Sequence, residues 1–174
     1  SVKFRTSSRK SGVNSKKRSL NRIADDMFSG CEAIESIEIP EGILEIGESA
    51  FEGCNQLSEV SLPDGLVAIG KRAFCENRLK EVVFPESMLY IGDYSFQNFD
   101  DASYISEVVS LNPEPPYCYG FGSSDIYAHA VLSVPAGSKQ KYLSHSSDWH
   151  LFSTINEIGQ PGQLKILRLP TGLK

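Results

Sequence analysis

Apolar residues return along this chain with a period of 22 or 23 residues. Each isoleucine that opens a unit is followed five residues later by a phenylalanine. The isoleucines are Ile23, Ile46, Ile69 and Ile91, and the phenylalanines are Phe28, Phe51, Phe74 and Phe96. A unit this short cannot bury an apolar face alone, so it must stack on its neighbours. The pattern therefore predicts a solenoid in which equivalent side chains form columns through the core.

Short parallel strands are predicted where an alternating segment ends at a proline. The three segments are Ile34–Ile39, Leu57–Leu62 and Leu79–Phe84, and a proline follows each of them. Proline is tolerated there because it closes a strand instead of lying within it. Alternate side chains of each strand should point into the core and out to solvent. We expect turns on the other sides of each unit.

The segments between these strands predict helical turns that direct each phenylalanine into the core. They are Glu48–Phe51, Lys71–Phe74 and Asp93–Phe96. Removal of one such phenylalanine is expected to cost about 3–5 kcal/mol. A glycine follows the isoleucine in three units, at Gly47, Gly70 and Gly92. We expect a positive φ at these glycines.

The motif I-G-x-x-A-F-x-G-C-x-x-L-x-x-V-x-L-P is almost complete over residues 46–63. It resembles the BspA-like, Treponema-type leucine-rich repeats of bacterial surface proteins, and the resemblance covers about residues 20–159. It implies a short right-handed leucine-rich-repeat solenoid of the α/β repeat class. This solenoid would be β-rich, with short parallel strands, short helical turns and a C-terminal α/β cap.

The C-terminal part resembles the closing motif of the same family, V-P-x-G-S…Y…W…F…I. The matching residues begin at Val134 and include Tyr142, Trp149, Phe152 and Ile155. Gly137 and Ser138 predict the start of a short helix through about Leu143, with Ser138 as its N-cap. Trp149 and Phe152 are expected to cover the last repeat, because terminal units of a solenoid need a cap.

Four segments follow from this organisation. Residues 1–22 are a basic arm or a partial first repeat, and residues 23–111 hold about four repeats. The last repeat is degenerate, with an insertion at Phe99–Tyr104 and Ser110 where an apolar residue is expected. Residues 112–159 form the cap, and residues 160–174 are a tail or an extra strand.

Charge is distributed unevenly over the chain. Residues 1–22 carry eight basic side chains and no acidic ones, which leaves 9 basic against 22 acidic residues elsewhere. Such an arm is compatible with nucleic-acid binding, with pairing to the acidic body, or with a solvated loop. Phe4 is its only aromatic residue, so it lacks a stacking platform for bases, and we expect no nucleic-acid partner. No apolar stretch approaches the length of a membrane span.

The cysteines allow two interpretations. Cys31 and Cys54 share one column, and stacked strands about 4.8 Å apart lie within reach of a disulfide. The alternative is that they are small buried residues of the core. Cys75 breaks the column. No metal-binding spacing of cysteine and histidine occurs, so we expect no cofactor and no metal.

Outward-facing strand positions form two polar columns, which are the predicted partner-binding face. The first column is Ser36, Glu59, Glu81 and Glu107, and the second is Glu38, Ser61, Val83 and Val109. A third acidic column follows the prolines, at Glu41, Asp64 and Glu86. Stacked like charges repel mildly, so a fold does not need them. The columns are interpreted as a soluble surface, a recognition face for a cationic partner, or a weak calcium site.

The family resemblance implies a secreted or cell-surface bacterial protein that acts in adhesion or protein–protein contact and not in catalysis. Its partner would be a protein or a glycan, including one of a host. A structural spacer is the alternative. A third hypothesis is a hydrolase that uses Ser147, Asp148 and His150, but no G-x-S-x-G motif accompanies them. The repeat pattern does not fix the oligomeric state.

Overall fold

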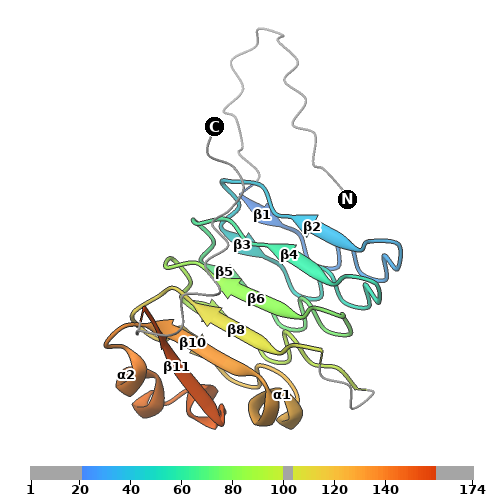
Figure 1. Ribbon diagram of the computed structural model, residues 1–174. Coiled ribbons are helices and arrows are strands. Elements are labelled where there is room, and N and C mark those ends of the chain that lie inside the picture. The colour runs from blue at the N-terminus through green and yellow to red at the C-terminus, as the bar shows by residue number, and fades with distance from the viewer. Residues whose placement is uncertain (1–20, 100–103, 160–174) are drawn as a thin grey trace, which may run out of the picture.

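The computed structural model describes residues 21–99 and 104–159. The chain winds through successive coils, and the repeat coils contribute parallel strands to two faces of the stack (Figure 1). The leucine-rich-repeat solenoid with a C-terminal cap is therefore confirmed. The core lies between the two faces, where the predicted columns of isoleucine, leucine and phenylalanine are buried.

The first face is a five-stranded parallel sheet in the order β1-β3-β5-β7-β9. Its strands have two residues each: β1 Arg22–Ile23, β3 Glu45–Ile46, β5 Ala68–Ile69, β7 Tyr90–Ile91 and β9 Tyr117–Cys118. The ladder joins each isoleucine of the column to the next one. We expected turns here, and that interpretation was wrong. The N–H and C=O groups of these short segments bond to equivalent segments of the next coil, so strands form without long alternating runs.

The second face carries the strands that the proline-terminated segments predict. The pair β2 and β4 spans Ser36–Glu38 and Glu59–Ser61. A four-stranded parallel sheet follows, with β6 Glu81–Phe84, β8 Glu107–Ser110, β10 Val131–Pro135 and β11 Thr154–Ile158. The strands are shorter than predicted, and pairing joins equivalent positions of successive coils.

A ladder of phenylalanine rings runs through the corner between the two faces. Successive ring centroids are 5.2 Å apart for Phe28–Phe51 and Phe51–Phe74, and 5.5 Å apart for Phe74–Phe96. The turns direct these rings inward as predicted, and Phe51, Phe74 and Phe96 are at most 1% exposed. Phe121 continues the ladder into the cap, with its centroid 4.7 Å from that of Phe96.

The glycines after the isoleucines do not have a positive φ, so that expectation was wrong. They are needed because the preceding coil lies directly against them. A Cβ on Gly70 would lie 2.6 Å from the backbone nitrogen of Glu48, and one on Gly92 would lie 2.5 Å from that of Lys71. The left-handed conformation falls two residues later in each coil, at Ser49, Arg72 and Tyr94.

All four cysteines carry free thiols. Cys54 is buried, and its thiol donates a hydrogen bond to the carbonyl oxygen of Phe28 over 3.2 Å. Burial raises the pKa of Cys54 to about 11, which keeps the thiol protonated at neutral pH. Cys54 is therefore a small buried residue of the core, as the second interpretation of the column has it. Cys31 is only half-buried and packs against the core.

The cap contains α1 Ser124–His129, α2 Lys139–Ser144 and a 3-10 turn, η1 Asp148–Leu151. The helix α2 begins after Ser138 as predicted, but the Ser138 side chain makes no capping hydrogen bond. The residue already has a helical backbone (φ −98°, ψ −16°), whereas capping side chains extend from a residue in the β region. Within the two described ranges, no helix has the length and apolar character to cross a membrane.

Trp149 and Phe152 cover the last repeat, as expected. The Trp149 ring is 1% exposed, and its centroid lies 6.4 Å from that of Phe84 and 6.0 Å from that of Phe121. Ser110 is buried in β8 because the cap supplies a polar partner. The Tyr142 hydroxyl lies 2.7 Å from Ser110 Oγ and donates to the carbonyl oxygen of Asn112, also over 2.7 Å.

Three cap side chains close the edge of the first sheet at β9. Ser147 Oγ accepts a hydrogen bond from the Cys118 N–H over 3.2 Å, and Asp148 Oδ2 accepts one from the Gly120 N–H over 2.6 Å. Trp149 Nε1–H donates to the Pro116 carbonyl oxygen over 2.7 Å. Ser147 Oγ and Trp149 Nε1 occupy the positions that a backbone C=O and N–H of a further coil would take.

The close contact between coils predicts the effect of adding one methyl group. Gly70→Ala is expected to lower the free energy of unfolding by about 1–3 kcal/mol, because its Cβ meets backbone that cannot move aside. Gly65→Ala is the matched control, since its Cβ meets only the Leu44 side chain at 3.8 Å. Chemical denaturation of both variants measures the difference. Equal stability of the two variants would contradict the explanation.

Candidate binding surface

The predicted partner-binding face lies along β2, β4, β6 and β8, which succeed one another on one side of the solenoid (Figure 1). The register joins Ser36 to Glu59 and Glu38 to Ser61 on the first pair of strands. Glu38, Glu59 and Ser61 are exposed and Ser36 is half-buried. These four side chains therefore lie together, as the columns predict.

On the next pair of strands the register joins Glu81 to Glu107 and Val83 to Val109. Glu81 is exposed and Glu107 is half-buried. Val83 is 38% exposed, but Val109 is only 8% exposed, so its expected place on the surface was wrong. β8 has a paired strand on both sides, and Val109 lies between Val83 and Ser133 in the ladder. The apolar element of this face is therefore Val83 alone.

Glu107 is the carboxylate whose surroundings oppose its charge. Partial burial raises its pKa, and the neighbouring charge of Glu81 raises it further. Carboxylates at directly opposed strand positions repel one another. The face therefore carries an electrostatic cost that a cation placed between these two groups would relieve.

The third acidic column, Glu41, Asp64 and Glu86, is also exposed beside these strands. In the part of the chain that the structure describes, no carboxylate of the three columns forms an ion pair. The described acidic, histidine and cysteine side chains form no group of three or more placed to hold a metal ion. The columns thus form an acidic strip, and its geometry gives no support to the calcium interpretation.

The basic arm lies outside the described residues except for Asn21 and Arg22. Arg22 forms ion pairs with Asp25 at 2.5 Å and with Glu45 at 3.4 Å. These partners belong to the first and second coils of the same chain. For Arg22, the interpretation as a partner of the acidic body therefore holds.

The candidate hydrolase side chains hold the cap in place. Ser147 and Asp148 accept the hydrogen bonds that close the β9 edge. His150 Nδ1 lies 2.9 Å from the carbonyl oxygen of Ser147. None of the three lines the two hollows that side chains of residues 32–105 form.

A row of exposed tyrosines lies on the first sheet near the cap, and sequence reasoning missed it. Tyr90 and Tyr117 occupy paired positions on β7 and β9, and the Tyr117 and Tyr119 ring centroids are 5.6 Å apart. Both Tyr90 and Tyr117 are about half exposed. The signal was present, because both directly precede the inward column of Ile91 and Cys118. We interpreted that side as turns and did not ask which way these residues face.

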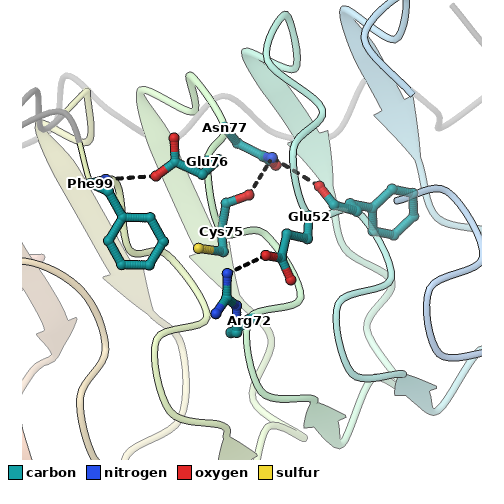
Figure 2. A network of polar contacts seen from close by, with 7 residues as sticks. Glu52, Arg72, Cys75, Glu76, Asn77 and Phe99 are labelled. Atoms are coloured by element: carbon teal, nitrogen blue, oxygen red, sulfur yellow. Dashed lines mark hydrogen bonds and ion pairs between the residues drawn. The ribbon is translucent and has the colours of Figure 1, made fainter. Parts of the chain in front are cut away.

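A polar network at the corner of the third coil was also missed (Figure 2). Arg72 forms an ion pair with Glu52, and its guanidinium lies 5.5 Å from the Phe99 ring centroid. Asn77 Nδ2 donates to the Phe51 carbonyl oxygen over 2.9 Å, the same type of contact that Cys54 makes one coil earlier. Asn77 thus occupies the position of the cysteine column.

A surface hollow of about 400 Å³ adjoins this network. Four successive coils contribute to its lining, which contains only polar or aromatic side chains. The signal for it in the sequence was the loss of the Gly-Cys pair from the third unit, where Glu76 and Asn77 stand instead. The break of the column at Cys75 did not by itself indicate a hollow.

The raised pKa of Glu107 predicts a pH-dependent effect on stability. The folded state disfavours its charged form, so folding bears a cost above the folded pKa that disappears as the pH falls through it. Glu107→Gln is expected to raise the thermal midpoint at neutral pH and to leave it unchanged below about pH 4, where glutamate is protonated in both states. Thermal unfolding at both pH values checks this. An equal rise of the thermal midpoint at low pH would show that packing of the amide, and not removal of the charge, causes the effect.

Comparisons with known proteins agree with this architecture. The chain is similar to a leucine-rich cell surface protein of Faecalibacterium prausnitzii A2-165, with 28% identity over 55% of this chain and a TM-score of 0.50. It shares its fold with the pneumococcal vaccine antigen PcpA, with 19% identity over 79% of this chain and a TM-score of 0.58. The chain spans 24% of the first protein's length and 39% of the second's.

No curated protein matches the sequence. The profile of the BspA-type leucine-rich repeat region, however, matches residues 4–112 in six copies. This match covers more than half of the chain and includes the coils that carry the acidic strip, the phenylalanine ladder and the glycine contacts. The chain therefore belongs to the BspA-type leucine-rich repeat family.

Proposed function

We propose that this chain is the partner-binding part of a secreted or cell-surface bacterial protein and that it acts in adhesion. The repeat family fits an interaction module. The similar protein from Faecalibacterium prausnitzii is described as a cell surface protein, which supports a surface location. Solenoids of this type present extended faces to their partners.

The observation that carries the proposal is the acidic strip, whose carboxylates form no ion pair with any described residue. Its carboxylates stand at equivalent positions of successive coils, where like charges repel by a few tenths of a kcal/mol for each pair. Partial burial raises the pKa of Glu107, and the neighbouring charge of Glu81 raises it further. A partner of opposite charge would convert this repulsion into attraction. We therefore infer that the strip binds a protein with a basic surface, with exposed Val83 adding apolar contact.

Electrostatic complementarity of this kind mainly sets the rate and specificity of association. The strip is exposed, so its attraction for a partner is screened by salt. These two properties suit an adhesin that meets its partner from solution. They also separate this function from that of a structural spacer, which needs no partner along the strip.

Charge reversal on the strip tests the proposal. Glu59→Lys and Glu81→Lys are expected to abolish binding to immobilised basic extracellular proteins, while the free energy of unfolding changes by no more than about 0.5 kcal/mol. Binding kinetics on the intact chain provide the measurement. Binding by the unmodified chain should also disappear at about 1 M salt, where the Debye length is about 3 Å.

Glu48→Lys is the matched control, because it changes the net charge equally at an exposed site beside β3, on the other sheet. This variant should bind as the unmodified chain does. Equal binding by Glu59→Lys, or equal losses in all three variants, would refute a role for the strip. Absence of binding by the unmodified chain would favour the spacer.

A further inference from the structure

Departures from the repeat pattern concentrate at the corner that precedes the strands of the second face. The first two coils have a Gly-Cys pair there, at residues 30–31 and 53–54. The third coil has Glu76 and Asn77 instead, and Glu76 adopts the positive φ (59°) that glycine has in the coils before it. A bulky residue in that conformation is strained. The packing of the repeat does not require this replacement, since glycine already satisfies the backbone at the same place.

The replaced residues border the hollow of about 400 Å³. This volume falls within the range of roughly 300–1,000 Å³ for small-molecule sites. Asn55 and Gln56 line it from the second coil, Glu76, Asn77 and Arg78 from the third, and Tyr104 from the end of the insertion. The hollow is therefore built from several coils, and its lining differs from the repeat pattern where the third coil contributes.

Asn77 has a polar atom without a partner among the described residues. Its Nδ2 group donates to the carbonyl oxygens of Phe51 and Cys75, which fixes the side chain (Figure 2). Its Oδ1 atom accepts no hydrogen bond from the described residues. The atom is buried, and the residue as a whole is only 4% exposed. An unsatisfied buried acceptor costs about 1–3 kcal/mol. A donor group in the hollow that reaches this oxygen would remove the cost.

Neighbouring contacts position three further residues of the lining, Glu76, Arg78 and Tyr104. Glu76 Oε1 accepts a hydrogen bond from the Phe99 N–H over 2.6 Å (Figure 2). The Arg78 guanidinium lies 5.8 Å from the centroid of the Tyr104 ring. Side chains fixed before binding lose less conformational entropy on binding. The lining therefore resembles a prepared site more than a set of free surface side chains.

The chemistry of the lining selects the class of ligand. The lining contains no aliphatic side chain that could contact an apolar molecule. It contains two carboxylates, Glu32 and Glu76, and one cation, Arg78, so it would repel an anion. A metal ion would need grouped acidic ligands, which the described residues do not provide. Hydroxyl groups both donate and accept hydrogen bonds, so they match amides, carboxylates and a guanidinium together. Tyr104 adds an aromatic ring.

We propose that this hollow binds a terminal sugar of a glycan, with a hydroxyl donating to Asn77 Oδ1. The site is separate from the acidic strip and does not depend on the function proposed for it. The sugar is held by hydrogen bonds to Asn55, Gln56 and Arg78 at the exposed rim. Binding gives a donor to Asn77 Oδ1, a buried side-chain acceptor that the described residues leave without one.

The test uses an array of immobilised neutral and N-acetylated mono- and disaccharides, followed by titration of the captured sugar monitored by NMR. We expect capture of at least one sugar, with the largest chemical-shift changes at the amides of Asn77 and Arg78. Gln56→Ala and Arg78→Ala should each weaken binding about tenfold or more, the effect of losing a hydrogen bond to a polar or charged group. Both residues are exposed, so the variants should fold normally.

Asn77→Cys restores the residue of the repeat column and is the sharpest variant. It removes Oδ1 and retains a donor for the Phe51 carbonyl oxygen, as Cys54 does for Phe28. Sugar binding should weaken about tenfold or more while stability is kept or increased. Glu59→Lys, which acts on the strip, should leave sugar binding unchanged.

Four outcomes would overturn the proposal: capture of no sugar, chemical-shift changes remote from the hollow, equal binding by Asn77→Cys, or binding that is lost in Glu59→Lys instead. Capture of basic proteins without any sugar would also overturn it, while leaving the function of the strip intact.

Discussion

The backbones of neighbouring coils must approach closely enough to hydrogen-bond, and the rest of the structure depends on that approach. The N–H groups of Gly47, Gly70 and Gly92 donate to the isoleucine carbonyl oxygens of the preceding coils over 2.8–2.9 Å. At the corner, the Phe51 and Phe74 N–H groups donate to the following coils over 2.8 Å. This spacing sets the phenylalanine ring separations, aligns the outward side chains in columns, and fixes where a hollow can form.

The sequence was informative wherever a residue recurs in register, since a recurring side chain in a stack has the same surroundings each time. The columns of Phe51 and Phe74 and the proline-ended strands were predictable on that ground, whereas the role of Trp149 followed from the resemblance to the closing motif of the family. The first sheet was not, because two-residue strands have no alternation to detect. The role of Gly70 was predicted wrongly. A close backbone contact and a positive φ both require glycine, and only the structure shows which of the two applies.

Prediction of the binding surfaces had a different limit. The acidic columns and their register followed from alternation, but burial of Val109 depends on β10, a cap strand outside the repeat pattern. The corner hollow was not predicted, because its signal is a departure from the repeat pattern. In the sequence, Glu76 and Asn77 resemble the substitutions of any degenerate repeat. In a regular solenoid the repeated columns form the scaffold, whereas irregular positions on adjacent coils are where a specific ligand can be recognised.

The cap ends one face of the solenoid and extends the other. The first sheet stops at β9, where Ser147 and Trp149 make the hydrogen bonds that a further coil would make and Asp148 accepts one more from Gly120. The second sheet continues into β10 and β11. A coil inserted directly between β9 and the cap would have to present the same donors and acceptor to these three side chains. Duplication or loss of whole coils among the regular repeats meets no such condition. The length of the array can therefore vary in evolution within the repeats, while the junction with the cap is preserved as a unit.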